Sequence, residues 1–277
     1  MPGKLFLVAT PIGNLGDLAP RAVATLRQVA FIACEDTRRS RVLLQQHRID
    51  TPTVSLPGFA EKERAGRILD RVSSGEDCAL ITDAGSPAIS DPGEVIVAEA
   101  VKRGIAVVPI PGPSAVIAAL SASGLPTARF CFLGFMPRKG TERKAVLEEV
   151  APLAATLVLY ESPQRLGQTL ADLLAALGDR RASVARELSK VHEEFVRGTL
   201  SSLHERYRDQ EPLGEIVLVV EGRTASPRWE EDEVKAALRE RLSEGDSLKA
   251  ASSDVAHRSG WQAQAVYRLG LALKARS

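Results

Sequence analysis

The sequence predicts an α/β fold built around a mainly parallel sheet. Short apolar runs at residues 5–9, 31–34, 78–82 and 105–108 alternate with segments of helical periodicity. Apolar strands that alternate with helices are typical of a parallel sheet covered on both faces. Loops rich in Gly, Pro and Ser follow several of these runs, and open α/β sheets bind ligands at such strand ends.

Helical periodicity in the first part of the chain covers residues 20–29, 37–48, 59–74 and 93–103. The last of these helices follows the loop 83–93, and residues 91–94 at the end of this loop are of types that often begin a helix. We expect Asp91 to be the N-cap, Pro92 to take the first helical position and Glu94 to be the returning carboxylate. A turn-forming stretch near residue 124 then ends the first domain, which we assign to residues 1–123.

A second set of strand-like runs covers residues 130–134, 156–160, 183–186 and 216–220. Helices are expected at residues 139–151 and 163–177. The segment 187–197 is more polar and has no long helical pattern, so we expect antiparallel pairing and a mixed sheet in this part. We assign residues 124–225 to a second α/β domain, with a cofactor cleft between the two domains.

Three helical patterns remain near residues 229–243, 247–258 and 261–274, after a turn-rich break at residues 222–227. We assign residues 226–277 to a small helical module that resembles a helix-turn-helix unit. Two interpretations stay open for this module, a helical tail docked on the main body or a contact to RNA.

Composition limits the function classes. The chain has 277 residues and a net charge of +1, so the whole molecule does not attract nucleic acid strongly, although a local basic patch is compatible with this value. Three widely separated cysteines, Cys34, Cys78 and Cys131, predict free thiols and a reducing compartment. No run approaches the ~20 apolar residues of a membrane span, so we expect a soluble, cytoplasmic protein.

Five loops come directly after strand-like runs, at residues 10–17, 35–39, 83–93, 111–115 and 161–165. Their joint occurrence indicates one cleft whose ligand approaches the backbone closely. The chain lacks the phosphate-binding loop, the dinucleotide fingerprint, C-x-x-C, H-E-x-x-H and G-x-S-x-G. The residues alone therefore indicate a cleft enzyme with no expected metal site and no evident covalent nucleophile.

The chain resembles the tetrapyrrole methylase superfamily in three motifs, VATPIGNLGD at 8–17, DAGSPAISDPG at 83–93 and PGPSA at 111–115. It resembles the branch that methylates ribosomal RNA in EDTR at 35–38, YESPQR at 160–165, ARELSKVHE at 185–193 and GEIV at 214–217. The resemblance covers residues 4–222 and, more loosely, the helical tail. Ser189 and Gln164 stand where this branch often has threonine and histidine.

The resemblance implies a two-domain α/β enzyme that uses S-adenosylmethionine. It further implies 2′-O-methylation of a cytidine in the decoding region of 16S rRNA, with the 30S subunit as partner, and a homodimer. The residues that it implies for cofactor binding are Pro11, Asp83, Ala84, Gly85, Ser86, Pro87, Ser114, Ala115, Tyr160, Ala185 and Gly214.

Candidates for removal of the hydroxyl proton are Glu187 and Lys190, followed by Asp36 and Glu161. Glu187 and Lys190 could equally be an ordinary ion pair, and Glu161 could offset a helix dipole. Basic residues near the expected mouth of the cleft could contact phosphate or simply lie on solvated helix faces. They are Arg38, Arg39, Arg41, Arg138, Lys139, Arg143, Lys144 and Arg165.

Three other functions compete with this hypothesis. One is a small-molecule methyltransferase acting on a tetrapyrrole, which the basic cluster at residues 38–41 and the helical tail disfavour. Another is a non-catalytic RNA-binding or ribosome-assembly factor. The helix-turn-helix resemblance also permits DNA regulation, which the net charge of +1 disfavours.

Overall fold

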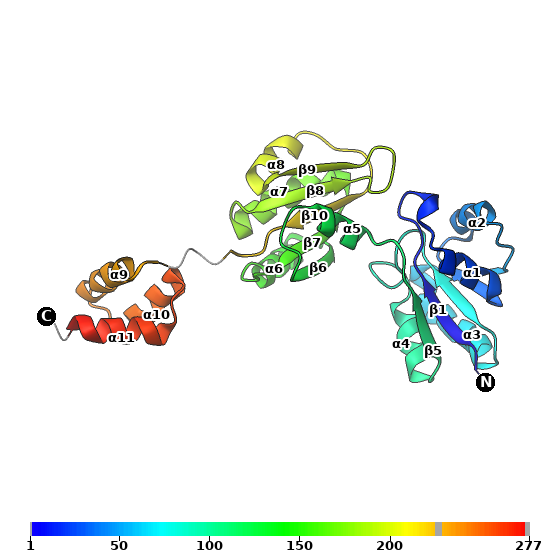
Figure 1. Ribbon diagram of the computed structural model, residues 1–277, viewed down its shortest axis with the longest axis horizontal. Coiled ribbons are helices and arrows are strands. Elements are labelled where there is room, and N and C mark those ends of the chain that lie inside the picture. The colour runs from blue at the N-terminus through cyan, green and yellow to red at the C-terminus, as the bar shows by residue number, and fades with distance from the viewer. Residues whose placement is uncertain (1, 225–228, 275–277) are drawn as a thin grey trace. The chain divides into compact units, whose positions relative to one another are not determined.

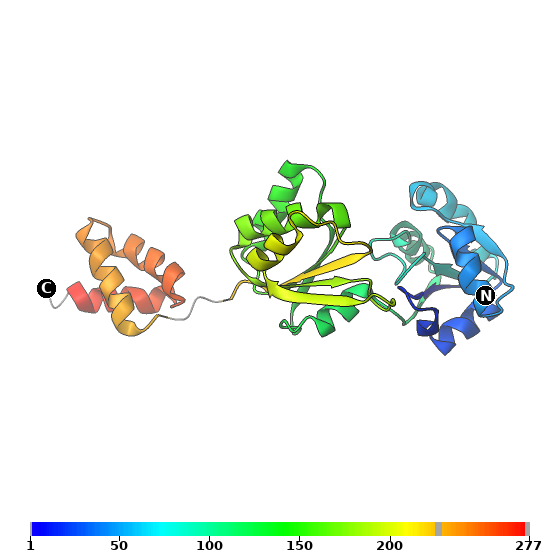
Figure 2. The ribbon, with the colours of Figure 1, turned by 90° about the horizontal axis from the view of Figure 1, so that it is seen from above.

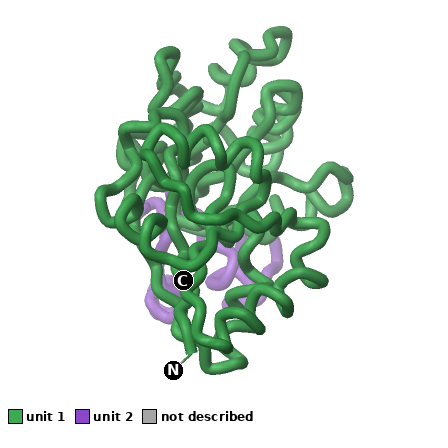
Figure 3. Tube along the Cα trace, turned by 90° about the vertical axis from the view of Figure 1, so that its right-hand side faces the viewer, with its two compact units in different colours: residues 1–222 green, residues 223–277 purple. Residues whose placement is uncertain are grey.

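The computed structural model describes residues 2–224 and 229–274. The chain divides into two compact units, Met1–Gly222 and Arg223–Ser277, which Figure 3 colours separately. Unit 1 contains two sheets, and the described residues of unit 2 form helices but no strand (Figure 1). No helix in the described part of the chain has the length and apolar character needed to cross a bilayer.

The first sheet of unit 1 is entirely parallel, as the sequence predicts. Its strand order is β3-β2-β4-β1-β5, with Leu5 paired to Cys78 on one side and to Val107 on the other. The strands are β1 (Lys4–Val8), β2 (Phe31–Cys34), β3 (Thr53–Ser55), β4 (Cys78–Ile81) and β5 (Ala106–Ile110). The short edge strand β3 is absent from the sequence prediction.

Helices cover both faces of this sheet (Figures 1 and 2). Leu26 of α1 and Leu43 of α2 pack with Val8 and Ile32 in one apolar cluster, while Leu69 of α3 packs in a second cluster. The helices are α1 (Pro20–Gln28), α2 (Thr37–Gln46), α3 (Glu61–Ser73) and α4 (Glu94–Lys102), and η1 (Leu15–Asp17) and η2 (Gly58–Ala60) are short 3-10 turns. The four predicted helices are thus confirmed.

The expected cap of α4 is wrong. The helix begins at Glu94, its N-cap is Gly93 with φ of 137°, and no side chain at the cap position hydrogen-bonds to it. The buried carboxylate of Glu61 instead accepts hydrogen bonds from the backbone N–H groups of Gly93 and Ile96, each at 3.0 Å. Since α3 supplies the cap, Asp91 is not needed for this task.

The second sheet is mixed, which confirms the prediction. Its order is β6-β7-β10-β8-β9, where β6 and β7 are parallel and the other neighbours are antiparallel. The strands are β6 (Phe130–Phe135), β7 (Thr156–Glu161), β8 (Arg181–Arg186), β9 (Glu194–Thr199) and β10 (Ile216–Val220).

Helices also pack on both sides of the second sheet. Leu147, Leu170 and Leu203 share one apolar cluster with strand residues, whereas Val116 and Leu120 share another with the opposite face. The helices are α5 (Ala115–Ala122), α6 (Gly140–Val150), α7 (Leu166–Leu177) and α8 (Leu200–Tyr207), and η3 (Pro163–Arg165) is a 3-10 turn. The sequence predicts α6 and α7 but not α5 or α8.

Unit 2 is a bundle of the three predicted helices, α9 (Glu231–Ser243), α10 (Leu248–Ser259) and α11 (Ala263–Lys274). They bury Val234, Leu238, Val255 and Val266 against one another. Gly260 ends α10 in the left-handed conformation, with φ of 69°, and so turns the chain into α11. A small apolar core of its own therefore holds this unit together.

Candidate active site

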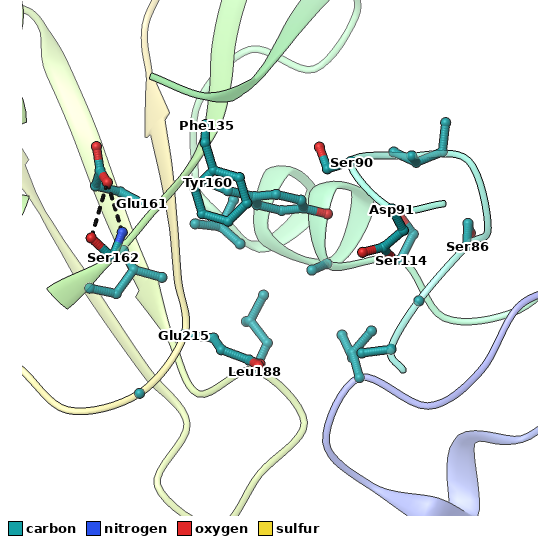
Figure 4. Close-up of a pocket in the computed structure, with 18 of the residues that line it drawn as sticks. Ser86, Ser90, Asp91, Ser114, Phe135, Tyr160, Glu161, Ser162, Leu188 and Glu215 are labelled. Atoms are coloured by element: carbon teal, nitrogen blue, oxygen red, sulfur yellow. Dashed lines mark hydrogen bonds between the residues drawn. The ribbon is translucent and has the colours of Figure 1, made fainter. Parts of the chain in front are cut away.

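A cleft of about 360 Å³ lies in unit 1 where loops of the first sheet face the second sheet (Figure 4). Small residues such as Ala84, Gly85 and Ser86 form much of the side contributed by the first half of the chain, and β7 and β10 contribute to the other side. The lining residues are Ile12, Ala84, Gly85, Ser86, Ile89, Ser90, Asp91, Ser114, Ala115, Phe135, Tyr160, Glu161, Ser162, Pro163, Leu188, Gly214, Glu215, Ile216 and Val217. Its position at the carboxyl ends of parallel strands is the one predicted from the loops.

Backbone hydrogen bonds join the loops after β1 and β4. The N–H of Thr10 donates to the carbonyl of Gly85 at 2.9 Å, and the N–H of Gly85 donates to the carbonyl of Thr10 at 3.1 Å. The Thr10 hydroxyl also donates to the Thr82 carbonyl at 3.1 Å. Gly85 has φ of 78°, a conformation that favours glycine. One rigid piece of backbone therefore supports this side of the cleft.

Strained backbone is concentrated in the two loops that flank the cleft. In the described residues, the positive-φ positions other than glycine are Arg48, Ala88, Ser90, Glu187 and Ser189. All but Arg48 lie in the loop after β4 or in the loop after β8, and Leu188 of the latter loop lines the cleft. Such conformations cost of order 1–3 kcal/mol each and cluster at functional sites.

Asp91 is a cleft-lining carboxylate that the sequence interpretation placed in a structural role. Burial first, and then the neighbouring carboxylates of Glu35 and Asp83, together raise the pKa of Asp91 to about 6, against a hydrogen bond to the Thr82 side chain. Figure 4 shows Asp91 beside Ser114, with the Tyr160 hydroxyl directed toward it. This carboxylate is therefore ionised near neutral pH and more basic than an ordinary aspartate.

Three aromatic rings form a wall at the side of the second sheet. Tyr160 of β7 lies edge-on to Phe132 with ring centroids 5.0 Å apart, and its centroid is 5.4 Å from that of Phe135. Burial, and then the charges of Asp91 and Glu215, raise the pKa of Tyr160 to about 12. The hydroxyl therefore stays protonated, and the exposed face of Phe135 offers a surface on which a planar ring can stack.

The expected cofactor residues fall on or next to this cleft. Ala84, Gly85, Ser86, Ser114, Ala115, Tyr160 and Gly214 line it. Pro11, Asp83 and Pro87 are each adjacent in sequence to a lining residue, and Ala185 on β8 is paired with the lining residue Val217. Ser114 also caps α5, as its position after a strand suggests, because its side chain accepts from the Ile117 N–H.

Glu161 lines the cleft but its carboxylate is held inside the protein. It is 2% exposed, accepts hydrogen bonds from the Ser162 N–H at 2.8 Å and the Thr169 hydroxyl at 2.6 Å, and lies 3.4 Å from Arg165. These contacts hold β7 to the helical segment that follows it. Its expected role in proton transfer remains a prediction.

Glu187 and Lys190 form an ion pair of 2.8 Å in the loop after β8, and neither lines the cleft. The hydrogen bond from Lys190 lowers the pKa of the Glu187 carboxyl. Lys190 also lies 3.2 Å from Glu215, and Glu187 accepts from the Glu215 N–H at 3.1 Å. The pair thus joins the loop after β8 to the start of β10.

Asp36 caps α2 by accepting a hydrogen bond from the Arg38 N–H at 2.8 Å, and this bond lowers its pKa. The start of α2 lies beside the loop after β4, because Arg39 of this helix pairs with Asp83 of that loop at 2.9 Å. Asp36 is not among the residues that line the cleft. No group of three or more His, Cys, Asp or Glu side chains in residues 2–224 and 229–274 is placed to hold a metal ion.

The expected RNA-contact residues separate into two groups. Arg38, Arg41 and Arg138 are exposed and form no ion pair with a described residue. The remaining five have partners: Arg39 with Asp83, Lys139 with Glu142, Lys144 with Glu148, Arg143 with Asp172, and Arg165 with Glu161 and the Met136 carbonyl. The first group has its cations free to meet phosphate.

Comparison with known proteins adds the family to this geometry. Residues 4–204 match the family described as tetrapyrrole (corrin/porphyrin) methylases. The chain is 44% identical to a Synechocystis protein over 99% of both chains, and 50% identical to one from Halalkalibacterium halodurans over 79% of this chain and 76% of that one. Both relatives are named ribosomal RNA small subunit methyltransferase I.

A relative from Thermotoga maritima with the same name is 44% identical, and its match covers 80% of this chain but 99% of that protein. Among solved structures, a diphthine synthase has a TM-score of 0.63 at 18% identity, covering 80% of this chain and 91% of that one. A Thermus thermophilus uroporphyrin-III C-methyl transferase complexed with S-adenyl homocysteine has a TM-score of 0.58 at 18% identity, covering 78% and 97%. The chain belongs to the tetrapyrrole (corrin/porphyrin) methylase family.

Proposed function

We propose that this protein uses S-adenosylmethionine to methylate the RNA of the small ribosomal subunit. In its finer form, the proposal is 2′-O-methylation of a cytidine in the decoding region of 16S rRNA. The observation that carries it is identity of 44% along the full length of a relative named for this class of reaction. Such relatives favour an RNA substrate over a tetrapyrrole and an enzyme over a binding factor.

The residues of the cleft fit the proposed cofactor. A volume of about 360 Å³ is within the usual range for small-molecule sites. Ala84 and Gly85 are small lining residues that leave room for a ligand beside them, and the ring of Phe135 offers a surface for adenine. The Oδ1 atom of Asp83, next in sequence to the lining residue Ala84, is buried without a hydrogen-bond partner. It can therefore accept a hydrogen bond from a donor group of a ligand.

When bound, the cofactor supplies an electrophilic methyl group on a positively charged sulfur. The protein must then hold a ribose hydroxyl in line with that methyl group and keep water away from it. The rigid loops joined by Thr10 and Gly85 can supply this alignment, which accounts for much of the rate in such transfers. Recognition of the 2′-hydroxyl itself would distinguish RNA from DNA.

The test is methyl transfer from labelled S-adenosylmethionine to 30S subunits that lack their own methylation, followed by nucleoside analysis. The expected product is 2′-O-methylcytidine, formed in proportion to enzyme and suppressed by excess S-adenosylhomocysteine. A different labelled nucleoside would refute the finer proposal. No transfer to 30S subunits, naked 16S rRNA or assembly intermediates would refute the proposed function, and transfer to a tetrapyrrole would replace it.

A further inference from the structure

The carboxylates that line the cleft are not equivalent. Among the described lining residues they are Asp91, Glu161 and Glu215. Arg165 lies 3.4 Å from Glu161, and Lys190 lies 3.2 Å from Glu215. Asp91 forms no ion pair with a described residue, and its side chain hydrogen-bonds to that of Thr82. Asp91 is therefore the lining carboxylate whose charge the protein does not neutralise.

The local structure also leaves Asp91 without the helix-capping role that its sequence context predicts. A carboxylate in the sequence Asp-Pro-Gly-Glu before a helix normally caps it, but Glu61 performs that function for α4. The preceding residue, Ser90, is held at φ of 62°, in a region that residues other than glycine seldom adopt. A carboxylate that does not cap the helix is thus held at the cleft next to strained backbone.

The groups that face Asp91 from the surrounding elements are mostly acidic. They are Glu35 after β2, Asp83 after β4, Glu215 before β10 and the phenol of Tyr160 on β7. Two cations pair with members of this group, Arg39 with Asp83 and Lys190 with Glu215. Burial and these charges raise the pKa of Asp91 to about 6, which suits a group that must be ionised at neutral pH and still accept a proton.

We propose that Asp91 accepts the proton of the attacking 2′-hydroxyl in the methyl transfer. This role rests on the function proposed above. A bond forms between the hydroxyl oxygen and the methyl carbon, the bond from that carbon to sulfur breaks with its electron pair staying on sulfur, and the hydroxyl proton passes to a carboxylate oxygen of Asp91. Solvent then takes the proton from Asp91 when the cleft opens to product release.

The first test compares Asp91→Asn with the wild type on 30S subunits. We expect kcat to fall about 100-fold, the usual loss for a missing general base, while the Kd for S-adenosylmethionine changes less than about threefold. Asp91→Glu keeps a carboxylate and should recover part of the rate. The matched control is Glu94→Gln, which changes an exposed carboxylate three residues further along and should leave kcat unchanged.

The second test is the pH dependence. For the wild type, log kcat should rise with unit slope below pH 6 and level off above it, and this break should vanish in Asp91→Asn. A readout without cofactor or RNA is the carboxyl ¹³C resonance of Asp91, assigned by its loss in Asp91→Asn. Its titration midpoint should lie near 6.

The outcomes separate this role from the proposed function. An active wild type with an equally active Asp91→Asn variant overturns the role of Asp91 alone. Parallel loss of rate and cofactor affinity overturns it too, because Asp91 would then be a binding residue. A carboxyl that titrates near 4 contradicts the basicity on which the role depends. A wild type inactive on every RNA substrate overturns the proposed function, and the role of Asp91 with it.

Discussion

The carboxylate of Glu61 caps α4 from another helix, by accepting a hydrogen bond from the Gly93 N–H at 3.0 Å. Glu61 stands near the start of α3, so the contact joins residues that are 32 positions apart in the chain. It sets where the loop after β4 ends and, through that, where Asp91 stands. A buried contact on one side of the sheet thus determines the position of a side chain in the cleft.

The first prediction concerns this cap. Glu61→Ala should lower the free energy of unfolding by about 2 kcal/mol, because it leaves two buried N–H donors without their charged acceptor. Urea denaturation followed by circular dichroism measures this change. Glu63→Ala, which removes an exposed carboxylate 4.0 Å from Arg67, should cost less than about 0.5 kcal/mol. Equal losses in the two variants would contradict the capping role.

A second prediction concerns Asp91 and stability. Its pKa is raised from 3.8 to about 6, so the folded state binds this proton more tightly than the unfolded chain. The wild type should therefore lose stability relative to Asp91→Asn as pH rises from about 4 to about 6, and stay lower above that. After allowance for solvent screening, the gain of the variant at pH 7.5 is on the order of 1 kcal/mol.

Thermal unfolding of Asp91→Asn and wild type at pH 4 and pH 7.5 measures this difference. The Tm values should nearly coincide at pH 4, and the variant should be the higher of the two at pH 7.5. A variant less stable than the wild type at pH 7.5 would mean that the carboxylate holds the fold together. Asp91 would then be a structural residue.

The third prediction concerns Gly13, which lies against the loop after β8. An added Cβ would stand 2.5 Å from Cγ of Lys190 and 2.7 Å from the Leu188 carbonyl oxygen. Gly13→Ala should push this loop outward and weaken S-adenosylmethionine binding about tenfold, or ~1.4 kcal/mol, by calorimetry. Gly140→Ala meets no atom within 4 Å and should bind normally. Unchanged affinity in Gly13→Ala would separate this loop from the cofactor site.

A fourth prediction concerns the exposed arginines. Arg38→Ala, Arg41→Ala and Arg138→Ala should each weaken RNA binding and reduce the slope of log affinity against log salt by about 1, with cofactor affinity unchanged. Filter binding at several salt concentrations measures this. The control is Arg67→Ala, an exposed arginine on α3. Equal loss of RNA and cofactor affinity would argue against a phosphate contact.

The fifth prediction concerns unit 2. The Thermotoga maritima relative is matched over 99% of its length by an alignment of 221 residues, which is close to the length of unit 1, Met1–Gly222. A protein ending at residue 222 should therefore fold and bind S-adenosylmethionine with unchanged Kd. If unit 2 contacts RNA, the affinity of the shortened protein for RNA should decrease. Calorimetry and filter binding distinguish these effects. Loss of cofactor binding in the shortened protein would show that unit 2 supports the cleft.

Most strands and helices could be predicted because their signals are local. Apolar runs such as residues 78–82 carry enough information for a buried strand. The short edge strand β3 has three residues, and α5 is apolar around most of its surface, so neither shows a clear period. The cap of α4 depends on a residue far away in the chain, which no local pattern reveals.

The part of the candidate site that the loops after the strands form could be predicted from the sequence. Residues such as Gly85 and Ser114 mark the cleft through their own sequence context. Phe135 and Glu215 come to the cleft from the second sheet, and only tertiary packing brings them there. The sequence also does not show which cations are paired. Arg165 pairs with the buried carboxylate of Glu161, whereas Arg38 is exposed.

The paired hydrogen bonds between Thr10 and Gly85 have a consequence for motion. Loop amides usually exchange with solvent deuterium quickly, since brief local opening exposes them. These two amides are bonded to each other's carbonyls, as in a sheet, so both must be released together before either can exchange. The side of the cleft that Gly85 lines should thus exchange more slowly than an ordinary loop, and a ligand that arrives there meets a surface that is already in place.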